Sequence, residues 1–158
     1  HWETEMMRET ERDIQREGRI ASAVSEKWNA QWGRLGIRAP FDVYFLRDKR
    51  LKAVAEVRFR RANIMDYRTV WIDVHKYLTL LQIEVYLKLP ALYIVAFNDG
   101  IYYARPSSLP AKDFEIKYTG RQRAGEWDEE DMHPALRVPR RFFSFICDGP
   151  IAASEEAR

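Results

Sequence analysis

Apolar residues recur at spacings of three and four near the start of the chain. These residues are Ile20, Ala21, Val24, Trp28 and Trp32. Because this spacing places them on one side of a helix, we expect a helix from Glu3 to about Trp32. Gly33 and Gly36 predict its end. Glu17 precedes the stripe at the same spacing, so it is either an inward-facing member of a site or a residue that stabilises the start of the helix.

Two dense apolar runs follow, Phe41–Leu46 and Leu51–Phe59, with the charged residues 47–50 between them. β-branched and aromatic side chains predominate in both runs, which is typical of paired strands covered on both faces. Because side chains alternate along a strand, Glu56 and Arg58 should point the same way.

Residues Tyr67 to Lys88 have helical periodicity, and Pro90 marks the end of this second predicted helix. Its apolar residues form two stripes. One stripe is Tyr67, Val70, Trp71, Val74, Leu78, Leu81 and Val85, and the other is Ile72, Leu80, Ile83 and Leu87. A helix that is apolar on two sides packs between two layers, here a sheet and either another helix or a partner subunit. Lys76 interrupts the second stripe, so its ammonium should either reach solvent or meet an acidic partner.

The second half of the chain reads mainly as strands. Ala91–Phe97 is a buried strand, and the turn signal at residues 98–100 makes Ile101–Ala104 its hairpin partner. Further strands are expected at Phe114–Tyr118, on a sheet edge, and at Arg137–Ile146, as a final strand or an arm.

These elements follow the order α-β-β-α-β-β, with extra C-terminal strands, which indicates an α/β fold. The 158 residues, of which 46% are hydrophobic, suffice for one buried core. We expect a single domain over residues 1–150, an irregular polar segment over 120–133 and a disordered tail over 151–158.

Composition excludes several classes of protein. No apolar run approaches the roughly 20 residues that span a bilayer, and the N-terminal stretch is too charged for a signal peptide. We therefore expect a cytoplasmic protein without membrane contact. The single cysteine, Cys147, excludes an internal disulfide framework and a zinc site with several cysteines. The sequence also lacks a P-loop, a dinucleotide-binding glycine motif and a Gly-x-Ser-x-Gly elbow.

Positive charge is concentrated in one stretch, although the net charge of the chain is only +2. Residues 33–61 contain nine cations against three acids, a local excess of six. Such a stretch either attracts a phosphate backbone or forms a solvated basic turn. Arg140 and Arg141 stand beside Phe142 and Phe143, so they either clamp nucleic acid or form the charged end of an edge strand.

Two carboxylates bracket the predicted hairpin. Asp42 opens its first strand, Glu56 lies on the second, and the cation Arg58 follows two residues later. Hard oxygen ligands on adjacent strands suit a divalent metal ion, which polarises a phosphate and lowers the pKa of a bound water. The pattern suits a metal-dependent phosphodiesterase. Carboxylates that merely cap strands and pair with arginine are the structural alternative.

The order helix, strand with Asp42, strand with Glu56-Val57-Arg58, helix and strand resembles the PD-(D/E)XK nuclease superfamily. The resemblance covers Asp13 to Ala104 and is greatest for the Holliday-junction-resolvase and phage-nuclease branches. It implies a restriction-endonuclease-like core, with helices flanking a central mixed sheet, and a gene carried by a phage or another mobile element. Two positions depart from the pattern, since Phe41 replaces the proline and Arg58 replaces the lysine.

By this resemblance, Asp42 and Glu56 would ligate Mg²⁺ or Mn²⁺ together with the backbone carbonyl of Val57. Glu17 matches a helical glutamate that supports the metal ion through water. Arginine remains protonated and is a poor proton acceptor. Some members of the superfamily place the lysine on the following helix, where Lys76 lies. We therefore expect Lys76 to be the catalytic cation and Arg58 to contact phosphate.

The resulting hypothesis is a metal-dependent DNA endonuclease, with structure-specific, resolvase-like cleavage as one form of it. Opposed strands of a junction require two sites, so a resolvase should be a two-fold dimer, for which the helix at 67–88 is the candidate interface. The predicted DNA contacts are Arg58, Arg60, Arg61, Arg140 and Arg141. The alternatives are a nuclease-fold protein that binds DNA or a protein partner without cleavage, and a small structural protein.

Overall fold

The structure is a computed structural model that describes residues 2–36, 39–120, 122–123, 126–127 and 132–149. Within these residues, six strands form a central sheet in the order β1-β2-β3-β5-β6-β11. The strands are β1 (Gln31–Arg34), β2 (Val43–Arg47), β3 (Arg50–Phe59), β5 (Ala91–Phe97), β6 (Gly100–Ala104) and β11 (Ser144–Cys147). β3 and β5 run parallel and the other neighbours run antiparallel, so the sheet is mixed, as expected.

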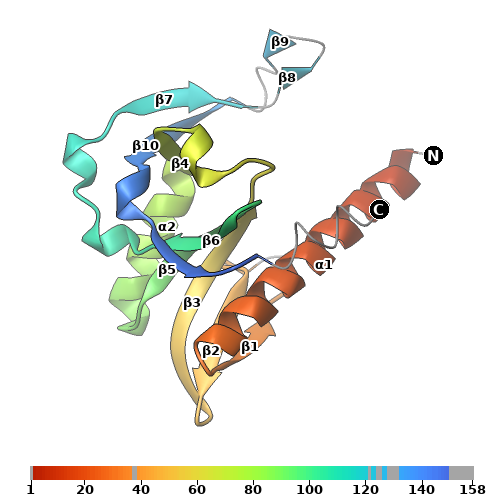
Figure 1. Ribbon diagram of the computed structural model, residues 1–158, viewed down its shortest axis with the longest axis vertical. Helices are drawn as coiled ribbons and strands as arrows, with labels where there is room; N and C mark the ends of the chain where they lie inside the picture. The colour runs from red at the N-terminus through yellow and green to blue at the C-terminus, as the bar shows by residue number, and fades with distance from the viewer. Residues whose placement is uncertain (1, 37–38, 121, 124–125, 128–131, 150–158) are drawn as a thin grey trace.

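Each face of the central sheet is covered by a helix (Figure 1). α1 (Trp2–Lys27) covers one face. α2 (Val74–Leu87) covers the other, together with a second, antiparallel sheet. This second sheet has the order β4 (Thr69–Asp73), β10 (His133–Pro139) and β7 (Ile116–Thr119). The short strands β8 (Gln122–Arg123) and β9 (Glu126–Trp127) pair with each other in a hairpin.

The two faces of the sheet have separate hydrophobic cores. Alternate residues of β3 divide between them, because Ala55 packs in the cluster that contains Val24 of α1, and Val54 packs in the cluster that contains Leu80 of α2. All seven residues of β5 are buried. A strand covered on both faces has no polar side to reveal its period, and this is why continuous apolar runs predicted β3 and β5 well.

The first helix is shorter than its apolar stripe predicted. α1 ends at Lys27, and Asn29 has a left-handed backbone (φ 51°) that turns the chain away. The following residues form β1, so the expected extension to Trp32 was wrong. Trp32 nevertheless packs against the α1-side core, and its indole N–H donates to Ser22 Oγ at 3.1 Å. Trp32 is apolar like the helical stripe because β1 folds back and packs it against the same core as α1.

Gly33 does not end a helix but lies in β1. A Cβ at this position would come within 2.2 Å of the Tyr44 ring on the neighbouring strand. Glycine is therefore required here by the close approach of Tyr44, not by a helix terminus.

The second predicted helix also needed correction. Residues 69–73 form β4, and α2 begins only at Val74. Thr69, Val70 and Ile72 favour extended backbone, and the strand pairs with β10. Apolar residues spaced by two and by four fit both a strand and a helix, which is why the boundary was missed. The helix ends at Leu87, and the capping residue Lys88 has a left-handed backbone (φ 55°), two residues before Pro90.

The connection between β2 and β3 is a two-residue turn of Asp48 and Lys49. Both residues have positive φ, 53° and 62°. Paired left-handed residues match the twist of a hairpin, and they do so here without the glycine that usually occupies such positions.

One residue of β3 is extra relative to β2. Leu46 pairs with Leu51, but Phe45 pairs with Ala53, so the register shifts by one. Lys52 lies between the two partners and forms a β-bulge. From Phe45 back to Val43, each β2 residue therefore pairs with a β3 residue one position further along than a regular hairpin would give, as Val43 does with Ala55.

The C-terminal elements differ in assignment from those predicted. The predicted strand at 137–146 is divided into the end of β10, a 3-10 turn at Arg140–Phe142 and β11. The predicted strand at 114–118 corresponds to β7, which lies at the edge of the second sheet.

Three expectations lie at least partly outside the described residues. They are part of the irregular segment at 120–133, the tail at 151–158 and the end of the domain at 150. Of the described helices, neither has both the length and the apolar character that crossing a membrane requires.

Candidate active site

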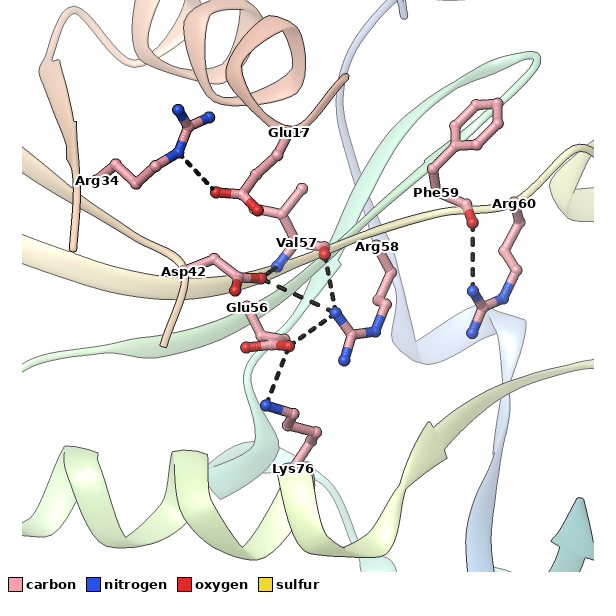
Figure 2. Close-up of polar contacts among 9 residues, drawn as sticks. All are labelled: Glu17, Arg34, Asp42, Glu56, Val57, Arg58, Phe59, Arg60 and Lys76. Carbon is pink, nitrogen blue, oxygen red and sulfur yellow. Dashed lines mark hydrogen bonds and ion pairs between the residues drawn. The ribbon is translucent and has the colours of Figure 1, made fainter. Parts of the chain in front are cut away.

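Asp42 lies one residue before β2, and its carboxylate turns toward β3 (Figure 2). Its backbone N–H donates to the Ala55 carbonyl oxygen at 3.0 Å. Its Oδ2 accepts a hydrogen bond from the Val57 N–H at 2.8 Å. The strand that carries Glu56 therefore also holds the Asp42 side chain in place.

Glu56 lies in β3 and is only 1% exposed. Burial raises the pKa of Glu56, and the positive charges of Arg58 and Lys76 offset only part of the rise. Its Oε1 contacts both cations. Its Oε2 is buried and has no hydrogen-bond partner within the described residues. A buried carboxylate oxygen without a partner is costly, so this atom is suited to a further donor or a cation.

Arg58 follows Glu56 by two residues, and both side chains leave the same face of β3. Arg58 Nη1 lies 2.8 Å from Glu56 Oε1, 3.2 Å from the Val57 carbonyl oxygen and 3.9 Å from Asp42 Oδ2 (Figure 2). Burial lowers the pKa of Arg58, but the neighbouring anions, Glu56 first among them, outweigh that effect and raise its pKa overall. The guanidinium is thus charged throughout the physiological range.

Lys76 reaches the Glu56 carboxylate from α2, the helix that covers this face of the central sheet. It lies in the first turn of α2, and its Nζ is 3.4 Å from Glu56 Oε1. Asp73 caps this turn, because its Oδ1 accepts hydrogen bonds from the N–H groups of His75 and Lys76 at 2.7 and 3.4 Å. The lysine that interrupts the apolar stripe therefore meets an acidic partner. Its catalytic role stays a prediction.

Glu17 approaches from α1, on the Val57 side of the strand (Figure 2). Burial raises the pKa of Glu17 and the charge of Asp42 adds to the rise, while Arg34 opposes it. Arg34 Nε lies 3.1 Å from Glu17 Oε1, and Arg34 Nη2 donates to the Ile14 carbonyl oxygen at 2.7 Å. Glu17 is thus near the carboxylate pair but is held by an arginine of its own.

The remaining candidate arginines lie just after β3 or in the turn after β10. Arg60 Nη1 donates to the Phe59 carbonyl oxygen at 3.2 Å (Figure 2), and Arg61 is exposed beside it. Arg140 Nη1 donates to the carbonyl oxygens of residues 65 and 67, at 3.2 and 2.9 Å. The Arg141 guanidinium stacks over the Phe142 ring at 4.8 Å. Arg140 therefore holds the loop before β4, a contact that its sequence position did not reveal.

Two further residues at the site were not identified from the sequence. Tyr93 of β5 pairs in register with Glu56 and is 1% exposed. Burial raises the pKa of Tyr93, and the charge of Arg58 opposes this. A tyrosine within an otherwise apolar strand was the available signal for it. Arg34 gave no such signal, because its contact with Glu17 joins two segments that only the fold brings together.

The donors at this site fit a hard divalent cation. They are the carboxylates of Asp42 and Glu56 and the carbonyl of Val57, and one buried carboxylate oxygen has no hydrogen-bond partner among the described residues. In the part of the chain that the structure describes, no three His, Cys, Asp or Glu side chains gather as a metal-binding group. A metal ion here would therefore depend on the backbone carbonyl as well as on the two acids.

The mixed sheet brings Asp42, Glu56 and the helical Lys76 together, as the resemblance to PD-(D/E)XK nucleases led us to expect. The family described as "Phage putative PDDEXK endonuclease" matches residues 4–146, and the chain belongs to that family. The resemblance inferred from the hairpin is thus confirmed, as is the fold class. Nucleases of this superfamily generally use divalent metal ions.

A solved structure with a similar arrangement is that of Hjc, a Holliday junction resolvase from the archaeal hyperthermophile Archaeoglobus fulgidus. The two chains are 11% identical with a TM-score of 0.47, over 85% of this chain and 97% of that chain. No curated protein sequence matches this chain.

Proposed function

We propose that the protein is a metal-dependent DNA endonuclease that hydrolyses phosphodiester bonds. The observation that carries this proposal is the convergence of Asp42, Glu56 and the Val57 carbonyl next to two cations. Mg²⁺ or Mn²⁺ held by these oxygens would supply charge stabilisation at the phosphate and an acidified water. Family membership supports the nuclease activity.

The two cations differ in what they can do. Lys76 carries a compact ammonium next to Glu56, so it can neutralise charge that develops on the phosphate and can exchange a proton. Arg58 stays protonated and presents several donors, which suits binding of a phosphate oxygen. Glu17 is a further acid near the site, and it can hold a water molecule from the α1 side.

DNA would be held by its backbone. Arg60 and Arg61 extend the basic end of β3 beyond the carboxylates, and Arg140 and Arg141 lie in the turn after β10. Arginine side chains neutralise phosphate charges and release counterions, so binding should weaken as salt increases. Contacts of this kind to the phosphate backbone position the DNA without reading its sequence.

We further propose that cleavage is structure-specific and that a homodimer forms through α2. The helix carries exposed apolar residues on its outer side: Leu78 (55% exposed), Val85 (70%) and Tyr86 (77%). Exposed apolar residues that gather on one helix are typical of a subunit contact. A two-fold pair would place two sites on opposed strands of a branched substrate.

The alternative function is a nuclease-fold protein that binds DNA, or a protein partner, without cutting. Arg58 is the observation that favours it, because a permanently charged guanidinium stands where the superfamily has lysine and contacts both acids. Cleavage assays separate the two functions.

Plasmid, single-stranded and four-way-junction DNA are incubated with Mg²⁺, with Mn²⁺ and with chelator. We expect metal-dependent cleavage that falls by about 100-fold or more in Asp42→Asn and Glu56→Gln, because several kcal/mol of charge stabilisation is lost. Lys76→Ala should lose about 100-fold as well, as expected for removal of one transition-state donor. Lys117→Ala removes an exposed lysine from β7 of the second sheet and is the matched control.

DNA binding without cleavage under every metal condition would establish the alternative function. Cleavage that survives in Glu56→Gln would show that the site described here is not the active site.

A further inference from the structure

A single nitrogen atom, Arg58 Nη1, contacts all three oxygen groups of the proposed metal site. It lies 2.8 Å from Glu56 Oε1, 3.2 Å from the Val57 carbonyl oxygen and 3.9 Å from Asp42 Oδ2 (Figure 2). These distances place a positive charge where the three oxygens converge. The side chain curls back along its own strand to reach this point, since Val57 is its immediate neighbour.

A divalent metal ion and the Arg58 guanidinium would need the same three oxygens. A divalent ion bonds to carboxylate and carbonyl oxygens at about 2.0–2.6 Å, which is shorter than any of these contacts. A metal ion bound by the same three oxygens would bring a second positive charge next to the guanidinium, and the two cations would repel each other. Arg58 and the metal ion therefore compete for the same oxygens. Arginine cannot escape the conflict by losing its proton, because it remains charged at physiological pH.

The Arg58 side chain can move toward solvent. Its side chain is 34% exposed, whereas the Glu56 side chain is 2% exposed. Lys76 continues to contact Glu56 from α2, so the carboxylate keeps one cationic partner when the guanidinium leaves. The buried acid is therefore fixed, and the arginine is the part that can move.

We propose that Arg58 is an internal counter-ion that closes the site in the metal-free protein and must swing out before a divalent metal ion binds. It thereby sets the metal concentration at which the site loads. This inference rests on the proposed function, since it takes Asp42, Glu56 and the Val57 carbonyl as the metal donors. The consequence is that Arg58 opposes metal binding, while it remains available to the phosphate once displaced.

Mn²⁺ binding measured by calorimetry without DNA tests the inference. Arg58→Gln should bind Mn²⁺ about ten-fold more tightly than the unmodified protein, because no charge-assisted contacts have to be broken first. Arg60→Gln removes the same charge two residues further on, just after β3, where the guanidinium donates to the Phe59 carbonyl oxygen. The affinity of Arg60→Gln for Mn²⁺ should stay within about two-fold of that of the unmodified protein. This control separates the contact of Arg58 with the metal donors from the general effect of removing one positive charge.

A second measurement uses the unmodified protein, and a variant serves only to assign the Arg58 resonance. In protein labelled with ¹⁵N-arginine, the Arg58 side-chain resonance should shift on titration with Mg²⁺, and the Arg60 resonance should not. Arg58→Lys provides the assignment.

The inference is overturned if Arg58→Gln binds Mn²⁺ equally or more weakly, or if the Arg58 resonance stays in place at saturating Mg²⁺. In either case the proposed nuclease function stands if the unmodified protein still cuts DNA. Absence of metal binding by every form, together with absence of cleavage, overturns the inference and the proposed function together.

Discussion

Glu56 combines burial with opposing electrostatic interactions. Its carboxylate is 1% exposed and burial raises its pKa, yet two cations contact one of its oxygens and the other has no partner within the described residues. A buried charge stabilises a fold poorly, since desolvation offsets most of the attraction between the partners. A buried acid of this kind is typical of a functional position, where an environment prepared for another charge is useful.

With chelator present, Glu56→Gln should raise the melting temperature, and more so at pH 8 than at pH 5. A glutamate with a raised folded-state pKa binds its proton more tightly in the folded protein than in the unfolded chain. Stability is therefore highest below the ordinary pKa and falls as pH rises through the raised one. Glutamine has no proton to lose, so it escapes this loss. A gain of about 1 kcal/mol would appear as about 2–4 °C in a chain of this length.

Scanning fluorimetry at both pH values measures this effect, and Glu115→Gln, at an exposed ion pair, is the control. A lower melting temperature for Glu56→Gln at pH 8 would mean that the contacts with Arg58 and Lys76 outweigh the cost of burial.

At the residue scale, the sequence predicted the acids but only part of their surroundings. Asp42 and Glu56 stood out because each belongs to a dense apolar run of the predicted hairpin, where an acid is unusual. Lys76 stood out because it broke an apolar stripe. Arg34 could not be found in this way, since its contact with Glu17 links a strand to a helix and leaves no trace in local spacing. The roles of all these residues stay predictions.

At the scale of elements, the helix α2 and the strand before it form one functional unit. β4 ends at Asp73, whose side chain caps α2 and fixes the turn that carries Lys76. The sequence did not reveal this boundary, because the apolar residues of β4 also fit the helical stripe that follows. The Asp73 cap was the local signal that a helix begins at Val74. Buried strands such as β5 were predicted with correct limits because turn residues flank them directly.

Asp73→Ala should lower the free energy of unfolding by about 1 kcal/mol, or about 2–4 °C in melting temperature, because the first turn of α2 loses its cap. Cleavage should fall further than stability alone explains, since Lys76 lies in that turn. Asp73→Asn is the matched control, because asparagine caps as well as aspartate and should stay within a few tenths of a kcal/mol. Loss of activity in Asp73→Asn equal to that in Asp73→Ala would refute the role of the cap.

At the scale of the whole molecule, α2 joins the candidate site to the outside. Lys76 faces the central sheet, and the exposed residues Leu78, Val85 and Tyr86 belong to the same helix. A partner subunit on this helix would therefore bear on the element that supplies the proposed catalytic cation. The overall arrangement of layers was predicted from the sequence, whereas the second sheet was not, because its strands come from distant segments.

Val85→Glu should shift the protein from dimer to monomer in light scattering at micromolar concentration, because a charge would enter an apolar contact. Paired cutting of a four-way junction should then be lost, while nicking of plasmid persists. Leu51→Glu, at an exposed leucine near the hairpin turn, should change neither. A dimer that is unaffected by Val85→Glu would locate the interface elsewhere.

The bulge at Lys52 has a consequence that can be expressed as parity. Across a regular hairpin with a two-residue turn, facing residues differ by an odd number, as Arg47 and Arg50 do. Thirteen residues separate Asp42 from Glu56, so their numbers differ by fourteen, which is even. They can face each other only if the hairpin holds one residue too many, and the register beyond Lys52 supplies that shift. An even interval between two acids on a predicted tight hairpin is thus itself a sign that a bulge lies between them.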